Sequence, residues 1–347
     1  MRYKTRFFLF FAGMILFNLA ANFAHPVTPT IIQELQLPDY MFGLMFAAMM
    51  LTNFLFSPFW GKINTAISSR QTLLTGCVGY AVAQLGFAYA TTQAGILAVR
   101  ILAGFFVGGI YVSFLTYVIN VAKPEDQAKY LTYNATIYAV FSAFGYLVGG
   151  ILGEFSIRAT FLLQAATLVV AGLIFRFACI PDNSDARDLP LGEIVRQSNP
   201  LQAFLDGGKF MNAAFVMLFA VNILMNFANT GFDQVFNYYL KDQLDLTSSY
   251  NGLIKAAVGL ISFLCNMTLC MWIIRKTDTR KSLLVVTIFC TAASVGALMI
   301  PQIPLFIAVS VLVYAGYSIS LPVLQHMVAQ RADPSLKNLV MGFYNAT

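Results

Sequence analysis

Two polar stripes run along otherwise apolar stretches of this sequence. In the first, Asn18, Asn22 and His25 are spaced at i, i+4 and i+7, which places them on one face of a helix. The second stripe continues the same spacing to i+11 and consists of Asn222, Asn226, Asn229 and Asp233. Such groups can bind a polar solute, or they can simply bond neighbouring helices at about 0.6–2 kcal/mol each. Because the stripe occurs twice, we favour the interpretation that both copies line a cavity.

Three charged residues within or near the apolar stretches are candidates for coupling. Arg100 lies inside its stretch, where a charge costs about 2.5–3.5 kcal/mol on insertion scales. We therefore expect it to bias proton binding on a nearby acid or to hold an anionic group; the alternative is that it snorkels outward to water. Asp233 and Lys255 lie near the outer ends of consecutive stretches. For these two residues a mutual ion pair and a coupling role both remain open.

Aromatic residues and glycines complete the set of candidates. Tyr314, Tyr317 and Gln325 follow one side of a later stretch, and Tyr111 lies in an earlier one. This combination suits a partly apolar organic substrate, although in a chain with 32 Phe and 16 Tyr it is also typical of ordinary packing. Glycines at small-xxx-small spacing permit close helix contact; they are Gly104, Gly108, Gly145, Gly149 and Gly153.

These residues are carried by stretches long enough to cross a membrane. The chain is 59% hydrophobic and 10% charged, whereas soluble domains have about 25% charged residues. About 20 apolar residues span the hydrocarbon core, and helix is the open structure that satisfies its own backbone there. We predict an all-α membrane protein with ten complete spans, at 6–30, 40–60, 72–91, 95–121, 129–153, 157–180, 209–239, 250–274, 282–300 and 304–330. An eleventh is predicted to begin near Asn338.

The distribution of charge sets the predicted orientation. The net charge of +6 does not indicate nucleic-acid binding, because the basic residues form small clusters between the spans. Placing the N-terminus in the cytoplasm puts 17 of the 21 Lys and Arg residues on the cytoplasmic side. The first span is read as an uncleaved helix of a plasma-membrane protein. The five cysteines lie in or at the ends of spans without metal-ligand spacing, so neither a metal site nor a disulfide framework is predicted.

The sequence contains an internal repeat. Residues 18–24 reappear as 222–228, 69–74 as 279–284, and 133–136 as 344–347, all at offsets near 210. Three echoes in the same order predict two related halves, 1–180 and 209–347, joined by a cytoplasmic linker at 181–208. Adding the offset to the end of the first half predicts a protein of about 390 residues. The last one or two helices are therefore expected to lie beyond Thr347.

Local patterns and the plan of six plus six spans resemble one membrane family. After the second span come Gly61, Ile63 and Arg70, with Thr65 at a position that is usually acidic and Ser68 at one that is usually glycine. In the fourth span, an arginine is followed by glycines at four-residue intervals; these residues are Arg100, Gly104 and Gly108. On this evidence the whole chain resembles the major facilitator superfamily. Since Thr65 cannot make the charge-dipole contact of that family, the resemblance implies a weakened gate at this loop.

The fifth span is similar to a motif of proton-linked exporters in that superfamily. The matching glycines are Gly145, Gly149, Gly150 and Gly153. Tyr146 stands where the motif has proline. The resemblance implies that spans one, four, seven and ten line the substrate cavity. It also implies that Gly61 and Arg70 belong to a gate and that the glycines of spans four and five support tight sliding contacts.

The resemblance implies a secondary active transporter that moves a small organic solute by alternating access of its two halves. We expect a proton-coupled exporter, an antiporter that acts as a monomer in the lipid bilayer and needs no cofactor beyond the proton gradient. Tyr146 and Thr65 keep an uncoupled or importing carrier open as the alternative. An ATP-driven pump is not indicated because the phosphate-binding Gly-x-x-x-x-Gly-Lys pattern is missing. A membrane-embedded enzyme is the distant alternative, since the two histidines are far apart and no intramembrane acidic pair is present.

Overall fold

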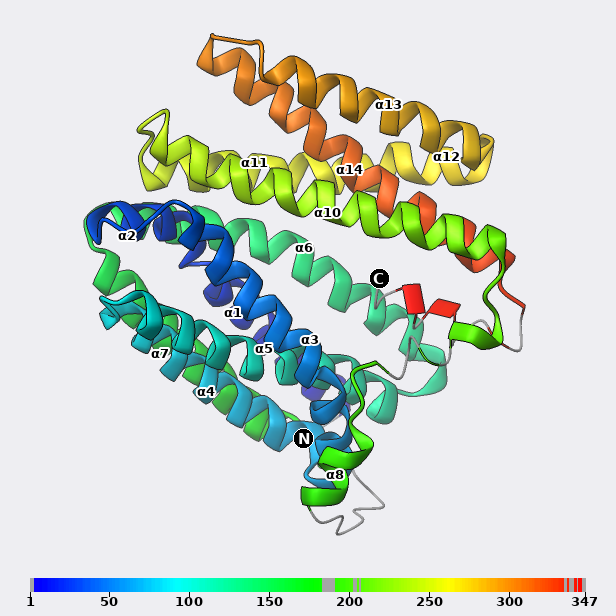
Figure 1. The fold of residues 1–347 in the computed structure, drawn as a ribbon. Helices are drawn as coiled ribbons and strands as arrows, with labels where there is room; N and C mark the ends of the chain where they lie inside the picture. The colour runs from blue at the N-terminus through cyan, green and yellow to red at the C-terminus, as the bar shows by residue number, and fades with distance from the viewer. Residues whose placement is uncertain are drawn as a thin grey trace. The chain divides into compact units, whose positions relative to one another are not determined.

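The chain forms a set of long α-helices joined by short connections, as the computed structural model in Figure 1 shows. It describes residues 3–182, 191–201, 205, 207–333, 336, 340, 341, 343 and 344, with the backbone but not the side chains of residues 65, 128, 191, 197 and 209. Within these residues, 10 helices are long and apolar enough to cross a membrane. The prediction of ten complete spans is confirmed.

Several predicted features fall outside the described residues. They are residues 183–190, 202–204 and 206 of the linker, the side chain of Thr65, and most of the predicted eleventh span, including Asn338 and residues 345–347. The linker does contain one short described helix, α8 (Leu191–Gln197). Ile194 of α8 is buried against Trp60 and Ile63 of α3 (Tyr40–Ala66).

The chain divides into two compact units. The first consists of Met1–Pro200 with Leu240–Leu253, and the second of Leu201–Tyr239 with Ile254–Thr347. Besides α3 and α8, the helices of the first unit are α1 (Tyr3–Ala21), α2 (Thr28–Glu34), α4 (Ser68–Tyr89), α5 (Gln93–Val121), α6 (Pro124–Phe155) and α7 (Ile157–Ala178). The unit boundary passes through α10 (Ala213–Asp242) and α11 (Ser248–Cys265).

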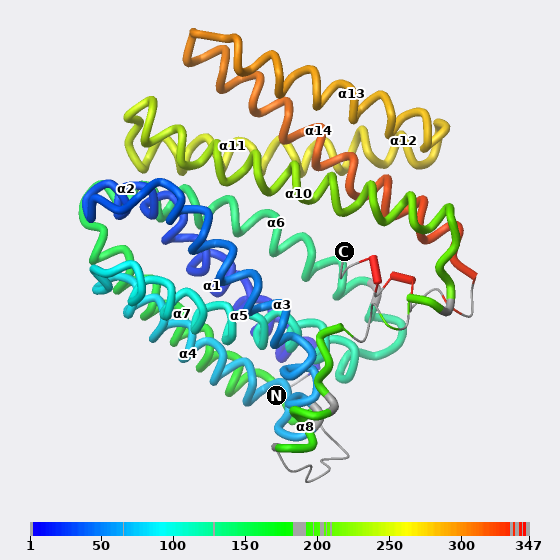
Figure 2. Tube along the Cα trace, viewed as in Figure 1, coloured from blue at the N-terminus to red at the C-terminus, as the bar shows by residue number. Residues whose placement is uncertain are grey.

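The first predicted span is interrupted rather than continuous. Helix α1 ends at Ala21, a 3₁₀ turn covers His25–Val27, and α2 begins at Thr28. The Cα trace follows α1 into the short helix α2 (Figure 2). Pro26 lies in the 3₁₀ turn and Pro29 in the first turn of α2, and proline lacks the N–H that a continuous helix requires. The predicted span at 6–30 lies within the membrane-length stretch Tyr3–Glu34, in which the apolar sequence continues although the helical hydrogen bonding is interrupted.

Close packing in the first unit depends on glycines. Helix α5 lies against α3 and α4, and α7 lies against α1 and α4. A Cβ atom at Gly104 of α5 would overlap the Met49 carbonyl of α3, and one at Gly149 of α6 would overlap the backbone of Phe23 after α1. At these two positions only glycine lets the backbones approach so closely.

The connection between α3 and α4 is shorter than predicted. Helix α3 continues through Ala66, so Gly61 is helical, and Arg70 lies in the first turn of α4. The two helices thus extend a few residues beyond the approximate bounds predicted for the second and third spans, 40–60 and 72–91. The turn is made at Ser68, whose φ of 54° lies in the left-handed region that favours glycine. This is the position where the family motif usually has its second glycine.

The second unit is built from α10, α11, a π-helical turn at Asn266–Cys270, α12 (Met271–Lys276), α13 (Thr279–Ala297) and α14 (Ile303–Arg331). The π-helical turn interrupts the span predicted at 250–274. Helices α13 and α14 pack as an antiparallel hairpin, which the trace in Figure 2 shows clearly. The apolar core of this unit includes Phe219, Leu324 and Phe343.

Candidate functional site

The polar stripe of the first unit lies at the end of α1 and in the turn that follows. Asn18 is buried; its Nδ2 donates to the Met14 carbonyl at 2.8 Å, while its Oδ1 finds no hydrogen-bond partner among the described residues. Asn22 Nδ2 donates to the Asn18 carbonyl at 2.8 Å. These amide donors are thus bound within their own helix. His25 instead stacks on Tyr146 of α6, with ring centroids 5.2 Å apart and an interplanar angle of 12°.

Arg100 is held inside the first unit by α5. That helix begins at Gln93, and the Thr92 side chain accepts a hydrogen bond from the Gly95 N–H as its cap. Arg100 is seven residues beyond Gln93, about 10 Å along the helix axis. Its side chain is directed into the protein, because the residue is only 6% exposed. Among the described residues no carboxylate pairs with it, and its Nε has no hydrogen-bond partner.

The nearest defined contact of Arg100 is an aromatic face. The guanidinium carbon lies 3.8 Å from the centroid of Phe87 on α4, which is in turn packed edge-on against Phe161 of α7 at 5.4 Å. A cation over a ring face is attracted by the ring quadrupole, more strongly when water is excluded. This stacking covers a face of the planar group, whereas the N–H bonds point along its edges.

A buried polar cluster near Arg100 was not predicted from the sequence. Tyr80 of α4 donates its hydroxyl to the Ala21 carbonyl at 3.4 Å and accepts from Gln84 Nε2 at 3.0 Å. Gln164 of α7 donates to the Ala20 carbonyl at 2.8 Å. These side chains donate to carbonyls in the last turn of α1, and the Ala20 carbonyl also accepts from the Phe23 N–H at 3.1 Å. The available signal was the presence of glutamines inside apolar spans, with Gln84 at i+4 from Tyr80.

The predicted glycines differ in their surroundings. At Gly108 a Cβ would lie 2.6 Å from Asn53 Oδ1, and at Gly145 it would lie 2.9 Å from the Asn22 Cβ. Close approaches of this kind are also made by Gly104, Gly149, Gly150 and Gly153. At Gly61, by contrast, the nearest atom would be Val112 Cγ1 at 3.9 Å, an ordinary contact distance.

The second unit brings together three residues that were predicted separately. Lys255 of α11 donates to the Asp233 carboxylate of α10 and to the Tyr314 hydroxyl of α14, the latter at 2.8 Å. The Lys255 side chain is 5% exposed and that of Asp233 30%. The Lys255 Nζ also lies 4.6 Å from the Tyr314 ring centroid and 5.7 Å from that of Phe236. The mutual ion pair considered from the sequence is present, and it connects three helices of this unit.

The rest of the second polar stripe extends along α10. Asn222 is buried and donates to the Tyr344 carbonyl at 3.2 Å, a contact between segments distant in sequence. Asn226 donates to both the carbonyl and the Oδ1 of Asn222, each at 3.0 Å. Asn229 is half-buried. Asn222 thus bonds another segment, as expected if the stripe holds helices together. For Asn226 and Asn229, a role in lining a cavity stays open.

The remaining aromatic and amide candidates are dispersed. Tyr111 of α5 contacts the rings of Phe17 and Tyr138, each with centroids 5.8 Å away. Tyr317 is half-buried, and Gln325 is exposed. Within the second unit, Tyr317 lines the cavity described next, whereas Gln325 does not.

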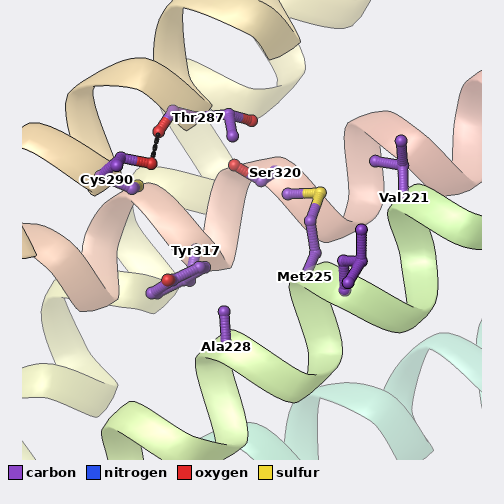
Figure 3. A pocket seen from close by; sticks show the side chains of 9 residues that line it. Val221, Met225, Ala228, Thr287, Cys290, Tyr317 and Ser320 are labelled. Carbon is purple, nitrogen blue, oxygen red and sulfur yellow. Dashed lines mark hydrogen bonds between the residues drawn. The ribbon is translucent and has the colours of Figure 1, made fainter.

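A cavity of about 250 Å³ lies between α10, α13 and α14 (Figure 3). Its threonine and serine hydroxyls are already bonded within their own helices: Thr287 to the Leu283 carbonyl, Thr291 to that of Thr287, and Ser320 to that of Gly316. Most of its remaining lining is apolar. By the internal repeat, α10 and α13 correspond to α1 and α4, the two helices against which α7 packs in the first unit. The cavity thus lies on a helix-packing face, and we do not assign it to the substrate.

Comparison with known proteins defines the class to which this fold and these sites belong. Residues 9–347 match the family described as the Major Facilitator Superfamily. The chain belongs to this superfamily, a family of multi-pass membrane transporters. The predictions of the superfamily and of an all-α membrane fold are confirmed.

Curated relatives are distant in sequence. The chain is 19% identical to multidrug resistance protein 2 of Bacillus subtilis (strain 168) over 80% of its own length and 69% of the relative. It is 21% identical to the quinolone resistance protein NorA of Staphylococcus aureus (strain Mu50 / ATCC 700699), covering 70% of this chain and 60% of NorA. It is 22% identical to the class B tetracycline resistance protein of Escherichia coli, covering 93% and 80%.

Solved structures share the fold at low identity. A bacterial homologue of the human lysosomal transporter Spinster has a TM-score of 0.76 at 12% identity, covering 100% of this chain and 78% of that one. A mutant form of the nucleoside transporter NupG has a TM-score of 0.77 at 11% identity, covering 97% and 86%. A D-xylose-proton symporter gives 0.71 at 14% identity, covering 99% and 87%. At these identities the likeness establishes the fold and no substrate.

Proposed function

We propose that this protein is a proton-coupled exporter of a small organic solute that works by alternating access. Three curated relatives are named for resistance to multiple drugs, quinolones and tetracycline, which supports export as the direction. The distribution of Lys and Arg supports a plasma-membrane protein with a cytoplasmic N-terminus. The observation that carries the coupling proposal is the buried contact of Lys255 with Asp233 and Tyr314.

The chemistry of this contact suits a proton-dependent switch. Protonation of Asp233 removes its negative charge and leaves the buried Lys255 ammonium without its ionic partner. Breaking a buried pair by neutralising one member costs about 3–5 kcal/mol. Because Asp233 is partly exposed, the cost for this pair should lie toward the lower end of that range. A membrane potential supplies about 2.3 kcal/mol per charge per 100 mV, which is of comparable size. Proton binding at Asp233 would therefore favour a rearrangement of α10, α11 and α14.

Arg100 and the two polar stripes complete the proposal. Besides Lys255 in the second unit, a further buried positive charge is present in the first unit, where α5 carries Arg100. Asn22, Asn226 and Asn229, which are half-buried, would offer amides to a polar group of the solute as the halves alternate. The solute, protons and lipid are the proposed partners, and the monomer is the proposed active form.

The proposal is tested in inside-out membrane vesicles from cells that express the gene. Respiration builds a pH gradient, a pH-sensitive dye reports it, and a quinolone, tetracycline and ethidium are added in turn. We expect at least one solute to dissipate the gradient. Asp233→Asn should abolish this proton-linked signal while exchange of labelled for unlabelled solute continues. Asp245→Asn is the matched control, because Asp245 forms an exposed ion pair with Lys241 at 2.8 Å.

The results separate coupling from transport. If solute moves but the proton signal is the same in wild type and Asp233→Asn, the coupling role of Asp233 is wrong. Flux down the solute gradient without any proton movement would instead support the uncoupled or importing carrier. That second candidate is favoured by Tyr146, which occupies the proline position of the exporter motif and stacks on His25.

A further inference from the structure

Two cations are buried among the described residues, and they differ in charge compensation. Lys255 and Arg100 are each 6% exposed. Lys255 has the Asp233 carboxylate as its partner, whereas no described carboxylate pairs with Arg100. A buried charge without a counter-charge is costly in a protein and more so inside a membrane. Arg100 is therefore a buried positive charge without a described counter-charge in the first unit.

The surroundings of Arg100 do not replace the missing negative charge. It lies about two turns into α5, beyond the first turn in which the helix dipole acts, and far from the negative end of that helix. The negative C-terminal end of α1 is occupied by other donors, because Tyr80 and Gln164 donate to the carbonyls of Ala21 and Ala20. Tyr80 interacts electrostatically with Arg100, but in its protonated form it supplies only a dipole.

The guanidinium retains free donors of a specific shape. Stacking on Phe87 at 3.8 Å fixes the plane of the group and covers a face. Its Nε has no hydrogen-bond partner, and no hydrogen bond to a described residue holds the outer edge. A fixed planar fork with free N–H bonds binds carboxylate or phosphate oxygens in a bidentate manner.

We propose that Arg100 is the binding residue for an anionic group of the transported solute, a carboxylate or a phosphate-type oxyanion. This inference rests on the proposed transport function and specifies its substrate class. The anion would neutralise Arg100 during passage, so that the guanidinium would no longer be a buried charge without a counter-charge. In this role Arg100 contacts the solute itself, rather than setting the proton affinity of an acid, since no described acid lies against it.

The first test compares the stability of purified protein in detergent without added ligand. A cysteine-reactive dye reports unfolding, because Cys77, Cys179, Cys270 and Cys290 are buried. Arg100→Gln removes an uncompensated charge and should leave the melting temperature unchanged or raise it. Lys255→Gln is the matched control, because it removes a compensated cation and strands Asp233; it should lower the melting temperature by several degrees. An equal fall in both variants would show that Arg100 is structural and would overturn the proposal.

The second test adds defined probes at constant ionic strength. Benzoate and methylphosphonate supply the two anion types, and benzamide is the neutral counterpart of benzoate. At about ten times its dissociation constant, at least one of the two anions should raise the wild-type melting temperature by about 2–4 °C and leave Arg100→Gln unchanged. Arg100→Lys, which keeps the charge but not the fork, should respond less than wild type. If benzamide stabilises wild type as well as both anions do, the proposal is wrong.

These outcomes are distinct from those of the transport assay. Equal export of anionic and cationic solutes by wild type and Arg100→Gln would refute the anion site and leave the exporter intact. Conversely, absence of any solute-linked proton flux would refute the exporter, while anion-dependent stabilisation through Arg100 would still be measurable. An anion that stabilises wild type but not Arg100→Gln supports the proposal and identifies whether carboxylate or phosphonate fits better.

Discussion

Asp182 accepts two hydrogen bonds from Ser69, one from its backbone N–H at 2.8 Å and one from its hydroxyl at 2.5 Å. The contact joins the segment after α7 to the first turn of α4, 113 residues away. A carboxylate at a helix N-terminus satisfies a free N–H and interacts favourably with the helix dipole. Asp182 thus supplies a negative charge near the α3–α4 connection, where the motif's usual acidic position is Thr65.

Asp182→Ala should weaken the attachment of this segment to α4. Loss of a helix cap costs about 0.5–2 kcal/mol, so the variant should melt at a lower temperature and its α4 N-terminus should exchange amide hydrogens faster. Asp39→Ala is a useful control, because Asp39 is the N-cap residue of α3 but makes no side-chain cap bond. Equal melting of wild type and Asp182→Ala would show that the contact contributes nothing to stability.

Ser68→Gly should stabilise the protein. Ser68 has a φ of 54°, and a non-glycine residue in the left-handed region costs about 1–2 kcal/mol. Glycine removes this strain, but it also increases the conformational entropy of the unfolded chain, which offsets part of the gain in stability. We expect a net gain of about 0.5–1 kcal/mol, measured by thermal or denaturant unfolding. Ser69→Gly, one residue further, should destabilise instead because it removes the hydroxyl that binds Asp182. The interpretation of strain at Ser68 fails if both variants lose stability equally.

The Lys255–Asp233 pair should show strong coupling in a double-mutant cycle. Asp233→Asn and Lys255→Gln each leave the other charge buried and partly unpaired, so each should lose up to about 3–5 kcal/mol. The double variant should be clearly more stable than the sum of the single losses predicts. Additive losses measured by unfolding would mean that the two side chains do not interact in the folded protein.

Gly104→Ala should disrupt the contact of α5 with α3. The new Cβ would overlap the Met49 carbonyl, which is backbone and cannot move aside cheaply. We expect a loss of about 1–3 kcal/mol or failure to fold. Gly43→Ala and Gly296→Ala are matched controls within helices, because nothing lies within 4 Å of their added Cβ atoms. These should be neutral or slightly stabilising by the helix preference of alanine.

The polar stripes should be reachable from water if they line a transport path. Cysteine placed at Asn22 or Asn226 in a cysteine-free background should react with a hydrophilic maleimide, and a transported solute should slow the reaction. Cysteine at Asn222, which is 1% exposed, should stay unreactive and serves as the buried reference. If neither test position is labelled, with or without solute, the stripes do not line a transport path and their amides only hold helices together.

The fold was predictable from the sequence to the extent that it depends on local hydropathy. Ten spans follow from the length of apolar stretches alone. The break after Ala21 was missed because residues 21–30 remain mostly apolar, although Pro26 and Pro29 marked it. Hydropathy did not predict the tight turn at Ser68. The reason is that α3 and α4 continue beyond their apolar stretches into polar residues.

The candidate sites were predictable as residue types but not as contacts. Asp233, Lys255 and Tyr314 were each identified from their own spans, yet their meeting depends on how α10, α11 and α14 pack. Tyr80 and Gln164 were overlooked, since their role is to bond carbonyls of α1, which a linear pattern does not reveal. The contact of Asp182 with Ser69 is likewise a product of tertiary structure.

The π-helical turn at Asn266–Cys270 fixes the rotational phase of the helical rod formed by α11 and α12. Such a turn accommodates one extra residue, and each residue of an α-helix advances the chain by about 100° around the axis. Deleting one residue here would restore regular α-helical geometry. However, it would also rotate one end of the rod relative to the other by about 100° around the helix axis, so that either Lys255 or Trp272 would face a different direction. The ion pair with Asp233 would then lose its alignment although none of its members had been altered. Sequence length between 255 and 272 is thus itself a determinant of the site, and a helical wheel drawn through this rod assigns the wrong faces beyond Cys270.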